Sequence, residues 1–302
     1  MLGRAALPQD SAIPAVTSTP TSFEVAALSH TGMVREANED CCATFVNDIG
    51  VGLVVADGVS SRHGADEASR LAVQVTLQAL LAQDDSVRLD KRLHRAVQQA
   101  NIAIHNRALI VPELRGMATT LTAVVLATDK LYGAHVGDCR LYLLREGRLL
   151  QLTRDHTLAA ERTRLGLLSK ARARNHPERS TLTRSVGREL IARVDQFAAP
   201  IYAGDVLVLC SDGQYNVLDD AEIAKLTSAA AFAEAACQSL IDAANERGSP
   251  DNVTAAVARV TAGPLPEAVA GGLFNTLLRN LRLPLSEIGW ALHTEPLAPK
   301  RS

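Results

Sequence analysis

Several acidic residues stand where a short apolar run of the sequence begins or ends. The clearest case is Val51–Gly58, in which a valine-rich run leads directly into Asp57 and Gly58. The run is too short for a helix and a turn signal stops it, so it predicts a buried strand that delivers a carboxylate to the rim of a sheet. Taken alone, Asp57 is better explained by an ordinary Asp-Gly turn at the end of the strand.

The same placement recurs at other acids, and the repetition changes the interpretation. Besides Asp57, the acids found at predicted strand ends are Asp212 (after the run Val206–Cys210), Asp138, Asp251 and the adjacent pair Glu39 and Asp40. One such acid is usually a cap or turn residue, whereas several around one sheet predict an all-oxygen metal site. Oxygen ligands without His or Cys favour Mg²⁺ or Mn²⁺ over zinc.

Arg35, a few residues upstream of Glu39 and Asp40, is the candidate phosphate-binding residue. A guanidinium can bind phosphate oxygens in bidentate geometry. Two divalent ions held roughly 3.5–4 Å apart can share a water molecule and lower its pKa, which makes a nucleophile. A solvated surface arginine is the simple alternative, and the adjoining acids disfavour it.

At this point the sequence resembles the metal-dependent protein phosphatases of the type-2C serine/threonine class, in their bacterial form. The resemblance covers about Glu24 to Val260, and it rests on motifs that are weak singly but specific as an ordered set. These are Gly32-x-x-Arg35-x-x-Asn38-Glu39-Asp40, Val55-Ala56-Asp57-Gly58, Gly116-Met117-Ala118-Thr119-Thr120, His135-Val136-Gly137-Asp138-Cys139-Arg140, Leu152-Thr153-x-Asp155-His156, Leu182-Thr183-Arg184-Ser185-Val186-Gly187, Cys210-Ser211-Asp212-Gly213 and Gly248-Ser249-x-Asp251-Asn252-Val253-Thr254.

The resemblance implies ligands for two Mn²⁺ or Mg²⁺ ions. Asp57 would bridge the two ions, and the Gly58 carbonyl would bind the second. Asp212 and Asp251 would complete the ligand set of the first ion.

The remaining site residues also take their roles from the resemblance. Glu39 and Asp40 would hold the second ion directly or through its waters, and Asp138 would serve a weaker third ion. Arg35 would hold the substrate phosphate. A hydroxide bridging the two ions would attack phosphorus in line, with Arg35, Asp40 and Asp57 as the catalytic residues and no phosphoenzyme.

Phosphoserine and phosphothreonine proteins are the implied substrates, and a cognate Ser/Thr kinase with its own substrates is the implied partner. The charged segment 158–179 would be the family's flap beside the site, involved in substrate choice. A pseudophosphatase, or a regulatory binding module with the same fold, is the alternative. Such a protein is expected to lose acids at the metal positions, and here all are present, which favours catalysis.

The chain departs from the bacterial pattern directly after Asp57. The usual run is Asp-Gly-Met-Gly-Gly-His, whereas here Gly58 is followed by Val59-Ser60-Ser61-Arg62-His63. The family's histidine is a candidate general acid, and whether His63 or Arg62 replaces it is open.

Cys139 and Arg145 also fit the C-x5-R signature of cysteine-dependent phosphatases. That chemistry needs a Gly-rich loop and a thiol of lowered pKa. The intervening residues 140–144 are a predicted strand without glycine, so we reject the match.

The elements that position these residues alternate in groups along the chain. Strands are predicted at 23–29, 41–46, 51–56, 119–127, 131–136, 140–144, 148–152, 193–197, 206–210 and 253–260, and helices at 65–82, 89–109, 221–226 and 231–245. This segregation predicts an α+β sandwich of antiparallel sheets with helices outside. The resemblance implies four layers, α-β-β-α, with two mainly antiparallel sheets packed face to face and a helix pair on each side.

Composition sets the remaining expectations. Of the 302 residues 47% are hydrophobic and 21% charged, and the formal net charge of -2 argues against a dedicated nucleic-acid or anionic-membrane binder. The five cysteines are scattered, which favours a reducing compartment and a cytoplasmic protein. No apolar run approaches the roughly 20 residues that a membrane span needs.

Composition also divides the chain into three parts. Residues 1–22 are expected to be a disordered tail, 23–261 the phosphatase domain, and 262–302 a linker, an amphipathic helix and a loose end. Docking of that helix on the domain is the simple expectation, and a protein partner for it is the alternative.

Overall fold

Two antiparallel sheets form the centre of the molecule in the computed structural model, which describes residues 23–59, 63–82, 86–127 and 129–262. The first sheet has the order β1-β11-β10-β7-β8, formed by Phe23–His30, Val253–Val260, Val206–Cys210, Arg140–Arg145 and Arg148–Gln151. The second has the order β2-β3-β5-β6-β9, formed by Asp40–Asn47, Gly50–Val59, Leu121–Ala127, Lys130–Val136 and Asp195–Pro200. The two-residue strand β4, Ala118–Thr119, pairs with the end of β3.

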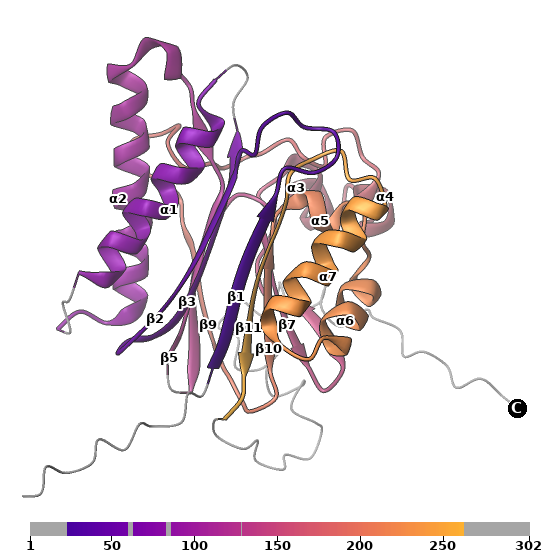
Figure 1. Ribbon diagram of the computed structural model, residues 1–302. Helices are drawn as coiled ribbons and strands as arrows, with labels where there is room; N and C mark the ends of the chain where they lie inside the picture. The colour runs from indigo at the N-terminus through magenta and orange to yellow at the C-terminus, as the bar shows by residue number, and fades with distance from the viewer. Residues whose placement is uncertain (1–22, 60–62, 83–85, 128, 263–302) are drawn as a thin grey trace, which may run out of the picture.

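Helices cover the outer side of each sheet (Figure 1). The long pair α1 (Ala65–Leu81) and α2 (Leu89–Ile110) lies on the second sheet, and the pair α6 (Asp220–Ala229) and α7 (Ala233–Glu246) lies on the first. The short helices are α3 (Leu158–Arg164), α4 (Lys170–Arg174), α5 (Asp212–Tyr215) and the 3-10 turn η1 (Pro112–Leu114).

Strand β3 shows why this arrangement has four layers. Its side chains alternate, so that Leu53 and Val55 lie in the core between the two sheets, while Val54 and Ala56 lie in the core beneath α1 and α2. Both faces of the strand are buried, which explains a continuous apolar run where a half-exposed strand would alternate with polar residues. A third core lies under α7, where Leu240 packs toward the first sheet. The predicted α-β-β-α sandwich is confirmed.

The structure differs from the predicted elements in three places. The predicted strand 119–127 is divided, with Thr120 separating β4 from β5. The strand predicted at 193–197 is β9, which extends from Asp195 to Pro200. The segment 158–179, predicted as an irregular excursion, contains α3 and α4. Their N-caps are Thr157 and Ser169, whose hydroxyls accept backbone hydrogen bonds from Ala160 and Arg172.

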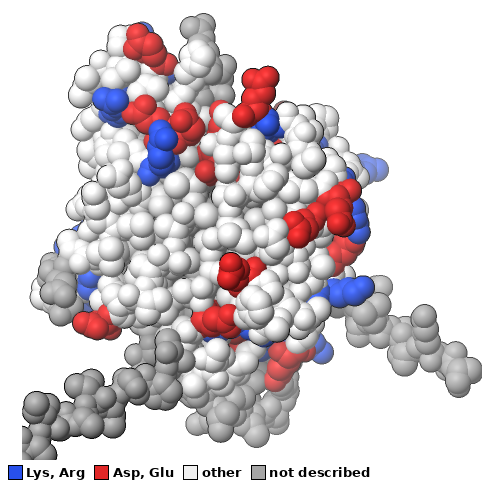
Figure 2. Space-filling model, in the orientation of Figure 1, with Lys and Arg blue, Asp and Glu red and all other residues white. Residues whose placement is uncertain are grey.

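The predicted N-terminal tail (1–22) and almost all of the predicted C-terminal part (263–302) lie outside the described residues, so those assignments stay predictions. Across the described residues, none of the helices combines the length and apolarity that crossing a membrane demands. On the face shown in Figure 2, acidic and basic side chains are interspersed around a largely uncharged centre.

Candidate active site

Antiparallel pairing brings the acids of the first sheet together at one end of its strands. Cys210, the last residue of β10, pairs with Arg140 at the start of β7 and with Ala255 near the start of β11. Asp212 follows β10, Asp138 precedes β7 and Asp251 precedes β11. Alternating strand directions therefore place three acids from distant parts of the sequence side by side.

The second sheet contributes its acids by direct pairing. Asp40 begins β2 and pairs with Asp57 near the end of β3, and Glu39 and Gly58 flank this pair. The backbone N–H of Gly58 donates a hydrogen bond of 3.0 Å to the Glu39 carbonyl.

A cavity of about 340 Å³ lies between these two groups of acids, and we refer to it as the acid cavity. Its lining residues are Arg35, Glu39, Asp57, Gly58, Val59, Asp138, Ser180, Thr181, Leu182, Arg188, Asp212 and Asp251. Every predicted site residue except Asp40 is in this group. The structure thus brings together residues that the sequence linked only through a pattern of strand ends.

Asp40 lies behind the cavity wall rather than in it. Its carboxylate is buried and accepts a 2.7 Å hydrogen bond from the Thr254 hydroxyl. Burial is the main cause that raises the pKa of Asp40 to about 7; hydrogen bonds from Thr254 and Ser211 act against it, and the charges of Asp212 and Asp251 act with it. Thr254 was not identified as a site residue from the sequence, although it belongs to the motif that contains Asp251.

The other carboxylates of the cavity are also destabilised in their charged form. Burial, followed by the charges of Asp40 and Asp212, raises the pKa of Asp57 well above its usual range. Burial and then Asp212 act in the same direction on the pKa of Asp138. For Asp212, burial and then Asp251 raise the pKa to about 6. Buried carboxylates that repel one another are a donor set that fits divalent cations, whose charge relieves both effects.

The carboxylates around the cavity lie farther apart than the ligands of one bound ion would. Within the described part of the chain, no three or more Asp, Glu, His or Cys residues are grouped closely enough to hold one ion. Arg35 donates to Asp251 at 2.8 Å and lies 3.7 Å from Glu39. The other Asp251 oxygen accepts the backbone N–H of Asn252 at 2.8 Å. For Asp251 to bind an ion through the oxygen nearest Arg35, it has to release that arginine.

The glycines that follow Asp57 and Asp212 are explained by close backbone contacts. A Cβ atom on Gly58 would lie 2.2 Å from the Ala65 carbonyl oxygen, and one on Gly213 would lie 2.0 Å from the Asn252 carbonyl oxygen. Any side chain at either position would push apart the segments that carry the acids. The Asp-Gly pairs therefore allow close packing around the cavity.

Asn252 holds the loop that carries Arg35. Its side-chain amide donates to the carbonyls of Thr31 and Ala37 at 2.8 and 2.9 Å, and its side-chain oxygen accepts the Glu39 N–H at 2.8 Å. One buried amide thus fixes both ends of the loop against the start of β11. The sequence contained a signal for this role only in the position of Asn252 directly after Asp251.

A buried network holds the turn at Asp138. The Gly137 N–H donates to His156 Nδ1 at 3.0 Å, so the opposite ring nitrogen carries the hydrogen and donates to Asp195 at 3.1 Å. Arg184 donates to the other Asp195 oxygen at 2.7 Å. The position of Asp138 therefore depends on β9 as well as on its own turn.

The structure also bears on the rejected C-x5-R match and on the residue that replaces the family's histidine. Cys139 is buried, and burial raises the pKa of its thiol well above the usual value, which is the opposite of what a thiolate nucleophile needs. Arg145 is buried in an ion pair with Asp205 at 2.7 Å. His63 is exposed and is not among the described residues that line the acid cavity, and Arg62 lies outside the described residues.

Three described segments of the cavity wall were not predicted as part of the site. Val59 follows Gly58, and the others are residues 180–182 and Arg188. The Ser180 hydroxyl donates to Asp212 at 3.4 Å. Residues 180–182 directly follow the predicted flap segment. Leu182 begins one of the family motifs and Arg188 follows its last residue, but no periodic pattern in the sequence marks these residues as part of a site.

Comparisons with known proteins agree with this geometry. The family model described as "Protein phosphatase 2C" matches residues 31–257. The serine/threonine phosphatase stp of Listeria innocua is 35% identical over 230 residues, covering 74% of this chain and 90% of the relative. The solved serine/threonine phosphatase PstP/Ppp of Mycobacterium tuberculosis has a TM-score of 0.72 and 33% identity, covering 79% of this chain and 98% of that chain. A PstP catalytic domain in complex with two manganese ions has a TM-score of 0.68 and 33% identity, covering 78% and 97% respectively.

Proposed function

The chain belongs to the protein phosphatase 2C family and is a serine/threonine phosphatase, and we propose that the acid cavity is where it hydrolyses phosphoserine and phosphothreonine in proteins. The observation that carries this proposal is the gathering of Arg35, Asp57, Asp138, Asp212 and Asp251 around one cavity. The two sheets deliver these residues from opposite sides, so a phosphoryl group entering the cavity would meet charged groups on both.

We infer that two Mn²⁺ or Mg²⁺ ions are the cofactors, with Asp138 as a ligand of a possible third. The mutual repulsion of the carboxylates and the two manganese ions of the similar PstP catalytic domain support this inference. After Asp251 releases Arg35 and the carboxylates move closer together, Asp57, Asp212 and Asp251 would hold one ion, and Asp57, Gly58, Glu39 and Asp40 the other. Bound ions would neutralise phosphoryl oxygens and lower the pKa of a water for in-line attack on phosphorus.

Arg35 would bind and orient the substrate phosphate. Its guanidinium is partly exposed at the cavity and is placed by the loop that Asn252 holds. Release from Asp251 would leave the guanidinium available to pair with two phosphoryl oxygens. Asp40, the buried cross-strand partner of Asp57, would help to hold the second ion directly or through its waters.

We propose that the enzyme acts in the cytoplasm. There it would remove phosphoryl groups that a cognate Ser/Thr kinase has added to its substrates in signalling. Scattered free cysteines in a partly or fully buried state support a reducing compartment. A binding protein with the same fold is the competing function, and the presence of all predicted acids in one cavity favours catalysis over it.

Phosphate release from a phosphothreonine peptide tests the proposal. We expect hydrolysis with Mn²⁺, loss of activity with chelator and recovery when Mn²⁺ is restored. Asp212→Asn is expected to be nearly inactive, while the matched control Asp242→Asn, on the exposed side of α7, keeps wild-type activity. Activity that survives chelation and is lost in Cys139→Ser would refute the assignment, and no hydrolysis of any phosphopeptide with Mn²⁺ would favour the binding protein.

A further inference from the structure

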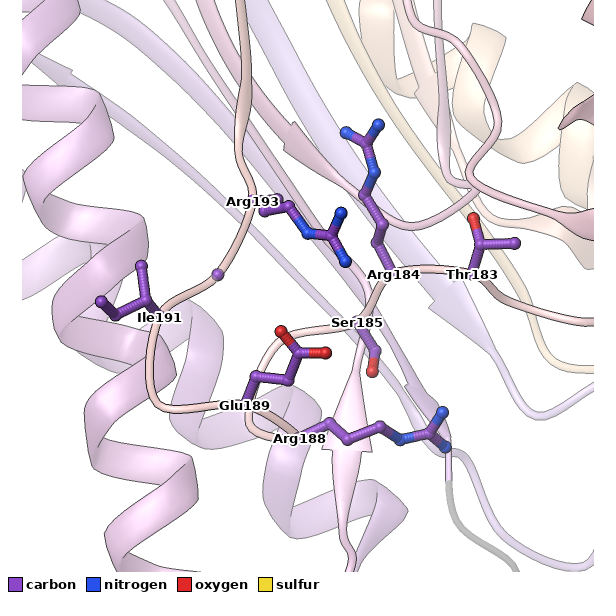
Figure 3. A pocket seen from close by; sticks show the side chains of 8 residues that line it. Thr183, Arg184, Ser185, Arg188, Glu189, Ile191 and Arg193 are labelled. Carbon is purple, nitrogen blue, oxygen red and sulfur yellow. The ribbon is translucent and has the colours of Figure 1, made fainter.

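A second, smaller pocket adjoins the acid cavity and shares Arg188 with it. Its volume is about 30 Å³, and it is lined by Thr183, Arg184, Ser185, Arg188, Glu189, Ile191, Ala192 and Arg193. We refer to it as the arginine pocket (Figure 3). The segment that forms it leads from the end of the predicted flap into β9.

Two of the three arginines in this pocket are available to a ligand. Arg184 is committed to Asp195, to which it donates at 2.7 Å. Arg188 and Arg193 make no ion pair with the residues that the structure describes, and both are exposed. Figure 3 shows the Glu189 carboxylate on the same side as Arg193, whereas the Arg188 side chain extends away from it. Glu189 can therefore offset the charge of Arg193, whereas Arg188 also lines the acid cavity and shares the charge of its carboxylates.

The pocket also contains two hydroxyl groups without a partner. Thr183 Oγ1 and Ser185 Oγ are buried and make no hydrogen bond within the described part of the chain. Buried hydroxyls normally find a partner, because leaving them unpaired is unfavourable. Figure 3 shows the Thr183 and Ser185 hydroxyls on opposite sides of the segment, so an oxyanion held by the guanidinium groups would accept a hydrogen bond from one of them at most.

The size of the pocket restricts the group that it can take. A volume of about 30 Å³ corresponds to roughly two water molecules, which suits a small polar group and excludes an aromatic ring. Because one arginine side chain lines both cavities, the two are close enough for neighbouring residues of one extended peptide, which advance about 3.3 Å each, to reach them together.

We propose that the arginine pocket binds an anionic group of the substrate polypeptide, a second phosphoryl group or a carboxylate, a few residues from the phosphoresidue held in the acid cavity. This inference rests on the proposed function and specifies its substrate class. Arg188 and Arg193 are then specificity-determining residues, and Glu189 weakens the selection that they exert.

Matched phosphothreonine peptides test the inference. At one position near the phosphothreonine, four peptides of equal length carry a neutral residue, a glutamate, a lysine or a non-hydrolysable phosphonate. The same set of four is made for the positions two and three residues before and after the phosphothreonine. The value of kcat/KM is measured with Mn²⁺ for each peptide, and an aryl phosphate serves as the reference substrate. The phosphonate and glutamate arms distinguish a second phosphoryl group from a carboxylate as the preferred anion.

We expect at least one anionic peptide to exceed the neutral peptide by about threefold to fivefold in kcat/KM, the range for a partly exposed ion pair. Arg193→Gln and Arg188→Gln each reduce this ratio, and Glu189→Gln increases it. Arg95→Gln, an exposed arginine on α2, is the matched control and keeps the ratio.

Three results would overturn the inference, and they are separable from failure of the proposed function. The inference is wrong if, while aryl phosphate hydrolysis continues, kcat/KM is equal for all peptides or is highest for the lysine peptide. It is also wrong if the preference for an anionic peptide is unchanged in both arginine variants. Absence of aryl phosphate and peptide hydrolysis with Mn²⁺ instead contradicts the proposed function, and the inference fails with it.

Discussion

At the scale of single residues, Arg35 has two roles in the site, one toward the carboxylates and one toward the substrate. Its guanidinium contacts Asp251 and lies near Glu39, so it balances the charge of the carboxylates in the protein without substrate. The same group is the one best placed to pair with phosphoryl oxygens. A residue that must exchange a carboxylate for a phosphoryl group depends on the planar fork of arginine, which lysine lacks.

Arg35→Lys is therefore expected to lower kcat/KM by about tenfold to 100-fold, because a point charge replaces a bidentate contact. Steady-state kinetics with a phosphothreonine peptide measures the effect. Arg115→Lys, an exposed arginine outside both cavities, is the control and keeps wild-type kinetics. Unchanged kinetics in Arg35→Lys would show that Arg35 is not the phosphate-binding residue.

The raised pKa values of the buried acids predict how pH affects the metal-free protein. Asp40 and Asp212 have folded pKa values of about 7 and about 6, against a usual value of 3.8. Between pH 4 and 7 the folded protein binds more protons than the unfolded chain, so stability decreases as pH rises through this window. The melting temperature of the chelated protein is expected to fall from pH 5 to pH 8.

Thermal unfolding at several pH values, with chelator and with Mn²⁺, measures this dependence. Bound cations favour the ionised carboxylates, so Mn²⁺ is expected to remove most of the decrease. Asp40→Asn in chelator should show a shallower dependence than the wild type. A chelated protein that becomes more stable toward pH 8 would contradict the assigned environment of these acids.

At the scale of elements, strand ends could be predicted from the sequence and the contacts between them could not. Short apolar runs and the turn signals after them locate Asp57 and Asp212 at strand ends. The pairing of Arg35 with Asp251 joins residues 216 positions apart and depends on how the Arg35 loop packs against the start of β11. No local pattern contains that information, and the same holds for the amide contacts of Asn252.

The division of β4 from β5 has a similar cause. The Asp57 N–H donates to the Thr120 side-chain oxygen at 2.8 Å, and the Thr119 hydroxyl donates to the Asp57 carbonyl at 2.8 Å. Thr120 therefore serves the strand that carries Asp57 through its side chain. Its β-branched type favours a continuous strand, so the sequence predicts one strand where tertiary contacts make two.

The close contact at Gly213 leads to a prediction about the α5 segment. A methyl group there would meet the Asn252 carbonyl at 2.0 Å, so Gly213→Ala is expected to displace Asp212 from Asp251. A displacement of about 1 Å can reduce activity by about 100-fold. Phosphate release is measured together with urea unfolding, which separates lost activity from lost folding.

Gly204→Ala is the comparison variant for this prediction. Gly204 has a positive φ of 90° but open space around its added methyl group, so it reports backbone strain away from the cavity. It is expected to lose stability and keep activity per folded molecule. Full activity in Gly213→Ala would show that the separation of the two acids tolerates the added group.

At the scale of the whole molecule, the described residues form three hydrophobic cores. The first lies under α1 and α2, the second between the sheets and the third under α6 and α7. The described lining of the acid cavity comes from loops and strand ends of both sheets, so we expect the sandwich to be sufficient to form it. Segregated strands and helices in the sequence were sufficient to predict an α+β sandwich with helices outside, and the four-layer order was implied by the family resemblance.

A chain trimmed to residues 23–262 is therefore expected to keep the melting temperature and the peptide phosphatase activity of the full chain. Calorimetry and phosphate release compare the two proteins directly. A large decrease in melting temperature would show that a terminal segment belongs to the folded domain. Unchanged melting with altered activity would assign that segment to substrate access.

The central claim is that the carboxylates of the acid cavity form the metal site. Calorimetric titration of metal-free protein with Mn²⁺ tests it most directly, using wild type, Asp57→Asn and the control Asp242→Asn. We predict at least two Mn²⁺ ions per chain for wild type and the control, and loss of tight binding in Asp57→Asn with its fold retained by circular dichroism. Equal Mn²⁺ stoichiometry and affinity in folded Asp57→Asn would contradict the claim.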